Sequence, residues 1–207
     1  DYRNDLISLV GYPSQAPMDA VATMAFDPVK RIALSLGQKT RSHFWGWDVS
    51  GPPVAGFGVT TAGLTGPGVA AWLDAFVSMH GIDYDPVNSR FTMWSEGGQV
   101  FSLSHGGGSL SSNWSIEELR QNSGTPGVDR PKTRAELDQE AFGAYQKADE
   151  GVNGKWKWAS DLNAFVGLQH NYFGNVWIYK PGSWVAPSST GSQTNLLPGP
   201  PRPAATS

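Results

Sequence analysis

Cysteine is absent from the 207-residue chain, which excludes disulfides, thiolate metal sites and a cysteine nucleophile. Charged residues make up only 16% of the sequence, and 15 Lys and Arg against 18 Asp and Glu leave a net charge of −3. A chain without a basic surplus lacks the electrostatic footprint of a nucleic-acid-binding protein. No apolar run approaches the roughly 20 residues of a membrane-spanning helix. We therefore expect no nucleic-acid partner and no membrane span.

Glycine, proline and aromatic residues are abundant instead. The chain has 25 Gly, 15 Pro and 9 Trp, and aromatic residues account for 12% of it. Frequent Gly and Pro indicate many turns between short strands. An apolar content of 39% is too high for a disordered chain. The composition is typical of a β-rich domain. Because the chain begins at Asp1 rather than Met, we expect either that a leader or a longer N-terminal part has been removed or that the chain is a fragment of a larger gene product.

Three segments repeat one pattern: residues 24–49, 81–103 and 154–179. Each consists of a strand, a turn rich in Asp, Pro or Asn, a second strand, a loop and a third strand. Apolar residues alternate with period two, as in half-buried strands. The alternation predicts that Ile32, Leu34, Leu36, Phe91 and Met93 face inward on the second strands, and Trp45, Trp47, Val100, Val176 and Ile178 on the third strands.

The turns and the outer strands can be predicted in the same way. Asp27 and Asp85 each precede a Pro, which presets the turn while the Asp carboxylate accepts backbone N–H groups; Ser160-Asp161 stands in that place in the third segment. Further strands are expected at residues 57–61 and 114–119, at residues 6–10, and from residue 182 to 185. Four antiparallel strands per repeated unit is the pattern of a β-propeller blade.

These residues carry a resemblance to a known family. An aromatic-Asp-Pro turn, a Gly after the second strand and an aromatic third strand, seen at Phe26–Pro28, Tyr84–Pro86, Gly37, Gly97-Gly98 and Asn175–Tyr179, resemble the Kelch-type, galactose-oxidase-like β-propeller repeat. The double glycine typical of that family occurs once. The resemblance implies an all-β fold of about three propeller blades in residues 1–185. Copper chemistry of the galactose-oxidase kind does not carry over, because it requires a Cys-crosslinked Tyr.

Two segments fall outside the repeats. Residues 130–148 predict a short helical insertion, since Thr133 and Glu136 have the spacing of a capping box and Leu137, Ala141 and Tyr145 follow at helical spacing. Residues 186–207 are rich in Pro and Ser and predict an extended C-terminal tail. Three blades cannot close a propeller ring of about four to eight. We therefore expect additional blades from another chain or another copy.

Few residues indicate chemistry. The four His are not spaced as metal ligands, and Asp83, Asp85 and Asn88 lack the spacing of a calcium loop, so we expect no cofactor and no metal. Neither a nucleophile elbow nor a phosphate-binding loop is present. Most Trp residues are expected to pack between blades. The candidates for ligand contact lie at loop edges and strand ends: Trp94, Tyr172, Phe173 and His105.

The leading hypothesis is a non-catalytic interaction module of an exported or surface assembly, which binds a carbohydrate or a protein partner. One alternative is part of an enzyme acting on polysaccharide, whose active site is shared with missing blades. Another is a structural subunit of a filament or particle, held together by the Pro-rich tail.

Overall fold

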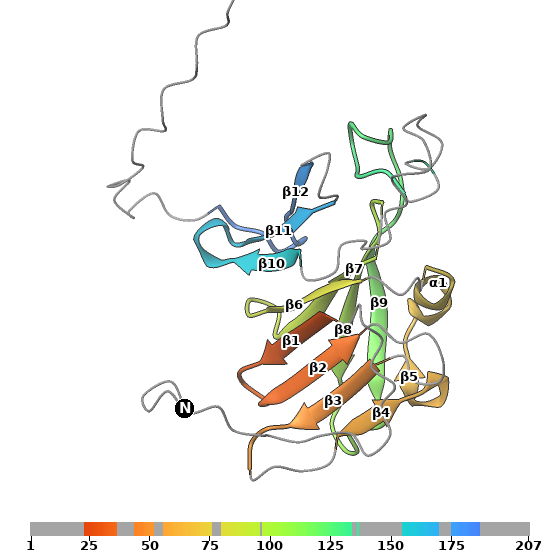
Figure 1. The fold of residues 1–207 in the computed structure, drawn as a ribbon, viewed down its shortest axis with the longest axis vertical. Helices are drawn as coiled ribbons and strands as arrows, with labels where there is room; N and C mark the ends of the chain where they lie inside the picture. Colours follow the sequence, from red (N-terminus) through yellow and green to blue (C-terminus); the bar gives the residue numbers. More distant parts are fainter. Residues whose placement is uncertain are drawn as a thin grey trace, which may run out of the picture.

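The computed structural model describes residues 23–36, 44–51, 56–75, 80–95, 97–133, 136, 155–169 and 175–186. These residues form three mainly antiparallel β-sheets, one short α-helix and two 3-10 helices (Figure 1). The all-β prediction is therefore confirmed.

The first sheet is a meander of four antiparallel strands, β1 (Thr23–Asp27), β2 (Ile32–Leu36), β3 (Phe44–Asp48) and β4 (Phe57–Val59). Leu34 and Leu36 on β2 are fully buried, and Ile32 is 4% exposed, as the period-two alternation predicts. β4 confirms the strand expected after the first repeat.

The middle sheet contains β6 (Gly81–Asp85), β7 (Arg90–Trp94), β8 (Val100–His105) and β9 (Trp114–Arg120) in the same meander order. β9 confirms the second predicted outer strand. A two-residue strand, β5 (Leu64–Thr65), pairs in parallel with β9 at the edge. The following helix, α1 (Val69–Asp74), is held beside β9 by a hydrogen bond from Gly68 N to Ile116 O of 2.9 Å. A 3-10 helix, η1 (Thr61–Gly63), leads into β5. The sequence pattern predicts none of these three elements.

The third sheet has three strands, β10 (Trp156–Ala159), β11 (Ala164–Leu168) and β12 (Val176–Tyr179), with the 3-10 helix η2 (Ser160–Leu162) in the first turn. The outer strand expected from residue 182 to 185 is not formed. Residues 181–186 make a turn instead, in which Trp184 N donates to Pro181 O at 2.8 Å.

The first hairpin of each sheet closes through the same four-residue turn, at residues 28–31, 86–89 and 160–163. In the first two, the Asp carboxylate accepts two backbone N–H groups, at 2.8 and 2.9 Å for Asp27 and at 3.1 Å for both bonds of Asp85. The predicted Asp-Pro turns are thus confirmed. In all three turns the last residue has a positive φ, namely 56° at Arg31, 51° at Ser89 and 48° at Asn163.

The prediction of which third-strand residues share the inward face of the second strand is wrong in all three sheets. Trp45 and Trp47 lie opposite Ser35 and Ala33, and therefore on the face away from Leu34. Val100 pairs with Trp94, on the face opposite to Phe91 and Met93. Val176 and Ile178 point outward, with 61% and 56% of their surface exposed. Each of these strands carries large apolar side chains on both faces, so hydrophobicity alone does not set the register.

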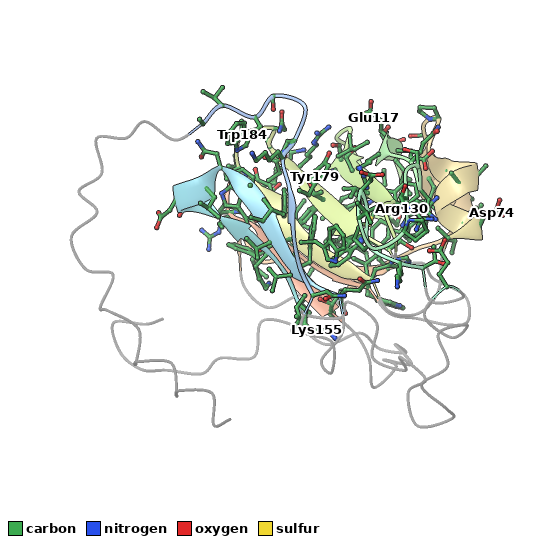
Figure 2. The ribbon with its side chains drawn as sticks, turned by 90° about the horizontal axis from the view of Figure 1, so that it is seen from above. Asp74, Glu117, Arg130, Lys155, Tyr179 and Trp184 are labelled. Carbon is green, nitrogen blue, oxygen red and sulfur yellow. The ribbon has the colours of Figure 1, made fainter. Side chains whose placement is uncertain are left out.

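The three sheets are stacked, with the middle sheet between the other two. The first strands lie side by side, β6 next to β1 on one side and next to β10 on the other (Figure 1). Side chains fill the spaces between the sheets (Figure 2). One core cluster joins the first and middle sheets, and a second joins the middle and third sheets. The described residues do not close a ring, so the prediction of propeller blades is not confirmed.

Several predicted segments lie outside the described residues. These are the strand at residues 6–10, most of the helical insertion at 130–148 and the tail, of which only residue 186 is described. The capping box itself is confirmed, because Glu136 N donates to Thr133 Oγ1 at 3.2 Å and Thr133 N donates to Glu136 Oε2 at 2.8 Å. In the described part of the chain, no helix is long and apolar enough to span a membrane.

Candidate functional site

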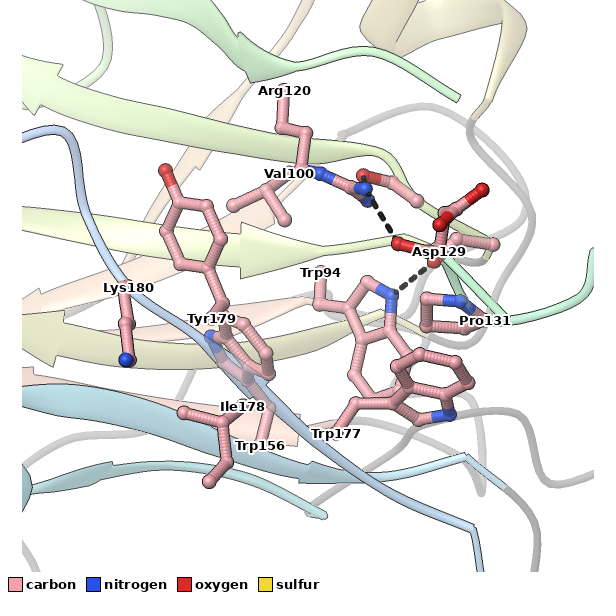
Figure 3. Close-up of a pocket in the computed structure, with 12 residues that line it drawn as sticks. Trp94, Val100, Arg120, Asp129, Pro131, Trp156, Trp177, Ile178, Tyr179 and Lys180 are labelled. Atoms are coloured by element: carbon pink, nitrogen blue, oxygen red, sulfur yellow. Dashed lines mark hydrogen bonds between the residues drawn. The ribbon is translucent and has the colours of Figure 1, made fainter. Parts of the chain in front are cut away.

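A cleft of about 250 Å³ opens between the middle and third sheets, at the end of β7 and along β12 (Figure 3). It is bounded by residues from both sheets and from the loop after β9: Trp94, Gly97, Gly98, Val100, Arg120, Asp129, Pro131, Trp156, Trp177, Ile178, Tyr179 and Lys180. Four of these are Trp or Tyr.

Two buried Trp residues form the floor of the cleft. The rings of Trp94 and Trp156 lie 5.3 Å apart between centroids, and each side chain is 2% exposed. Their indole N–H groups are fixed by backbone carbonyls, Trp94 Nε1 donating to Gly97 O at 2.9 Å and Trp156 Nε1 to Thr92 O at 3.2 Å. Gly167 permits this packing, since a Cβ there would lie 2.4 Å from the Trp94 ring.

Two partly buried aromatic residues of β12 form a wall. Trp177 and Tyr179 are two residues apart and therefore on the same face of the strand, toward the middle sheet. Trp177 Nε1 donates to Gln169 Oε1 at 3.2 Å, and the amide nitrogen of buried Gln169 donates to Lys132 O. Burial raises the pKa of the Tyr179 phenol. Tyr179 is thus a neutral hydroxyl at physiological pH and can both donate and accept hydrogen bonds.

Polar groups define the opposite rim. Arg120 donates from Nη1 to Gly98 O and from Nη2 to Asp129 O, both at 3.0 Å, which fixes the plane of the guanidinium (Figure 3). Asp129 Oδ2 accepts from Thr125 N at 2.9 Å, and this hydrogen bond holds the pKa of the Asp129 carboxyl below its usual value. The rim therefore presents an oriented cation and an ionised carboxylate.

Buried Arg130 anchors the loop that carries this rim. It binds both carboxylate oxygens of Glu136 at 2.7 Å, and its remaining donors reach Gly124 O and Pro131 O. The Arg130 guanidinium, with the capping-box bond from Thr133 N, lowers the pKa of Glu136 to about 2. Asp129 and Pro131 are the neighbours of Arg130 in the sequence, so the bonds of Arg130 hold both of them in place.

The fourth edge of the cleft is Lys180. Its ammonium lies 4.1 Å from the centroid of the Trp184 ring, and Trp184 Nε1 donates to Leu162 O at 2.9 Å. In Figure 2, Trp184 and Lys155 mark opposite ends of the third sheet. The cation–π contact restrains Lys180 beside the cleft without neutralising its charge.

The structure separates the candidates that the sequence proposed. Trp94 lies in the cleft. His105 is at the far end of β8, five residues or ~17 Å along the strand from Val100; its ring packs on Trp114 at 4.8 Å between centroids. Tyr172 and Phe173 lie outside the described residues. Trp94 and His105 therefore do not belong to one site.

Sequence reasoning missed Arg120, Asp129, Trp177 and Tyr179 as cleft residues. The correct phase of β12 would have identified Trp177 and Tyr179, because it places both on the face covered by the middle sheet. Arg120 and Asp129 come together through the loop after β9, which carries no recognisable pattern.

Neither a metal site nor a histidine site emerges from the described part of the chain. No group of three or more His, Asp or Glu there is arranged to hold a metal ion. Asp85 caps its own turn and accepts from Asn88 Nδ2 at 2.7 Å, while Asp83 accepts from Trp158 N at 2.9 Å. His80 is buried against Trp72, with ring centroids 6.2 Å apart, and burial lowers its pKa to about 4.

Comparison of the chain with protein-family models, with curated proteins and with solved structures gives no match. The Kelch-type resemblance therefore stays a prediction from the sequence.

Proposed function

We propose that this chain is a non-catalytic interaction module that binds carbohydrate in the cleft between the middle and third sheets. The observation that carries this function is the pairing of an aromatic wall, Trp177 and Tyr179, with an oriented polar rim, Arg120 and Asp129. Small-molecule sites typically have an apolar surface with a small number of polar groups placed around it.

A sugar ring matches both halves of this surface. Its C–H faces can stack on an indole or phenol ring, while its hydroxyl groups donate and accept hydrogen bonds around the edge. The Arg120 guanidinium offers donors only, the Asp129 carboxylate accepts, and the Tyr179 hydroxyl does both. The cleft is smaller than the about 300–1,000 Å³ of sites for drug-sized ligands. One ring of a longer chain would fit it better than a large compact ligand.

The expected setting is an exported or surface assembly in which further sheets complete the repeat. The sequence pattern and the stacking of the three sheets, each with its first strand beside that of its neighbour, support the further sheets. A protein partner bound at the same cleft is the competing ligand.

A glycan array followed by titration calorimetry tests carbohydrate binding. We expect the wild-type chain to retain at least one class of glycan, and Trp177→Ala to weaken that binding about tenfold or more, equivalent to about 1.4 kcal/mol. Trp177→Phe should keep most of the affinity because it keeps a ring. Val87→Ala is the control, since Val87 is 57% exposed in the turn after β6 and does not line the cleft.

Two results would overturn this function. One is the absence of any retained glycan; the other is binding that survives both Trp177→Ala and Tyr179→Ala. Release of reducing ends from a bound polysaccharide would contradict the non-catalytic part and favour an enzyme.

A further inference from the structure

The three sheets differ in how many of their faces are covered. The middle sheet is covered on both sides, by the first sheet across one core cluster and by the third sheet across the other. The first and third sheets each contribute one face to these clusters. Each of them also has a second face, at opposite ends of the stack.

The outer face of the first sheet is apolar at β1. Met24 and Phe26 alternate with the buried residues Thr23, Ala25 and Asp27, and they are 51% and 45% exposed. Cross-strand pairing places Ser35 beside Met24 and Ala33 beside Phe26, and Trp45 and Trp47 of β3 lie on the same face, on which Ser35 and Trp47 are buried. The exposed apolar surface on this face is therefore its β1 side, formed by Met24 and Phe26.

The outer face of the third sheet is apolar at β12. Val176 and Ile178 are 61% and 56% exposed, and the register places Val166 beside Ile178 and Leu168 beside Val176. Lys157, which pairs with Val166, also lies on this face. A row of β-branched residues on an exposed sheet face is what a packed neighbouring sheet ordinarily covers.

We infer that a second copy of this chain covers these faces, the third sheet of one copy packing on the first sheet of the other. The contact would continue the arrangement already present within the chain, in which β1 lies beside β6 and β6 beside β10. If the next sheet were added in the same way, β10 of one copy would lie beside β1 of another copy. Stacked repeats bury their faces on their neighbours, and an uncovered terminal face limits their stability.

The two surfaces are different, so the contact is heterologous. A heterologous contact closes into a ring when the rotation per sheet permits it. Two copies would supply six sheets, and closed propellers contain about four to eight. This assembly rests on the proposed repeat of sheets and not on carbohydrate binding; of the exposed apolar residues named for the two faces, Ile178 borders the cleft, whereas Met24, Phe26 and Val176, which the test changes, do not.

Light scattering coupled to size-exclusion chromatography tests the assembly. We expect the wild-type chain to have a mass that is a whole multiple, at least twofold, of 22.2 kDa. Met24→Lys and Val176→Lys should each give the single-chain mass, because each places a charge in every copy of the contact. Val128→Lys is the matched control, since Val128 is 73% exposed and lies in the loop after β9.

Mixing the two variants identifies the faces. In a mixture, the third sheet of the Met24→Lys chain and the first sheet of the Val176→Lys chain are both intact, so we expect a species of twice the single-chain mass to reappear. If Met24→Lys does not fold, judged by circular dichroism, Phe26→Lys tests the same face. A single-chain mass for the wild type would overturn the inference and indicate that another segment or another protein covers these faces.

An assembly whose mass neither variant reduces would overturn it equally. Loss of glycan binding does not affect this readout, so the two proposals fail separately.

Discussion

The two interfaces of the middle sheet differ in chemistry, although the same four strands form both. Toward the first sheet, the strands present Phe91, Met93, Phe101 and Leu103, all of them buried in one apolar cluster. Toward the third sheet, the alternate positions present Asp83, Thr92 and Ser102 along most of the sheet, and Trp94 and Val100 at one end. The apolar interface is filled by aliphatic and aromatic side chains.

The second interface is held differently. Asp83 accepts a hydrogen bond from Trp158 N, and Trp156 donates one to Thr92 O, so polar contacts cross between the sheets. The cleft lies at the end of this interface, where Trp94, Val100 and Arg120 of the middle sheet face Trp177 and Tyr179 of the third sheet. The first interface is therefore a closed apolar core, whereas the second combines an aromatic cluster with polar contacts and leaves a cleft at one end.

The largest difference should appear between two adjacent residues of β8. Leu103 is fully buried toward the first sheet and Ser102, 3% exposed, points toward the third. We expect Leu103→Ala to lower the free energy of unfolding by about 2–5 kcal/mol and Ser102→Ala to change it by less than about 1 kcal/mol. Urea denaturation followed by Trp fluorescence measures both. Equal losses would contradict the division of the sheet into two different faces.

The apolar side should also respond to acid through His80. Its folded pKa of about 4 is below the unfolded value of about 6.5, so in this window the unfolded chain binds a proton that the folded chain does not. Stability is therefore complete above pH ~6.5 and falls as the pH drops toward ~4, by at most about 3 kcal/mol. Unfolding measured across this range should show the decline, and His80→Gln should flatten it.

His105→Gln is the control for this pH dependence, because His105 is partly exposed at the end of β8. A slope between pH ~6.5 and ~4 that His80→Gln leaves unchanged would show that other groups cause the decline.

Replacing one glycine at each interface with alanine should give a smaller difference in stability. A Cβ at Gly46 would lie 2.2 Å from the tip of the Phe57 ring, and one at Gly167 would lie 2.4 Å from the Trp94 ring. Phe57 is partly exposed on the edge strand β4, and the next contact at Gly46 is the end of the Leu34 side chain at 2.8 Å, whereas hydrogen bonds fix Trp94 and Trp156. We expect Gly167→Ala to cost about 1–3 kcal/mol and Gly46→Ala less.

Thermal unfolding compares the two variants, with Gly182→Ala as the control, since no atom lies within 4 Å of a Cβ there. Gly167→Ala should also weaken glycan binding, because Trp94 is displaced toward the cleft. The opposite order of stabilities would show that the aromatic interface is the more adaptable one.

The repeated strands and turns could be predicted from the sequence because their determinants are local. Asp27 and Asp85 bind backbone groups two and three residues ahead, and the alternation at Leu34 and Leu36 reflects one covered face. The third strands could not be phased, because Trp45, Trp47 and Val100 lie in segments that are apolar on both faces. Likewise, α1 and β5 are short and depend on contacts with β9, which no local pattern encodes.

The cleft was only partly predictable for a related reason. Trp94 could be selected because it ends a strand before a double glycine. Trp177 lies in a strand whose inward-facing residues were mispredicted. Arg120 contacts Asp129, nine residues later, only because the loop after β9 folds back. A binding surface built between two sheets depends on both of them, and neither segment alone indicates it.

The three equivalent turns have one further consequence, for engineering. Arg31, Ser89 and Asn163 adopt left-handed backbone conformations, which cost an ordinary L-residue about 1–2 kcal/mol and glycine almost nothing, while Asn tolerates them better than most residues. None of the three positions carries glycine, and all three turns lie away from the aromatic cleft. The chain therefore holds an unused reserve of stability at Arg31 and Ser89, where a change to glycine would relieve the backbone without altering the cleft, whereas Asn163 also donates to Val185 O.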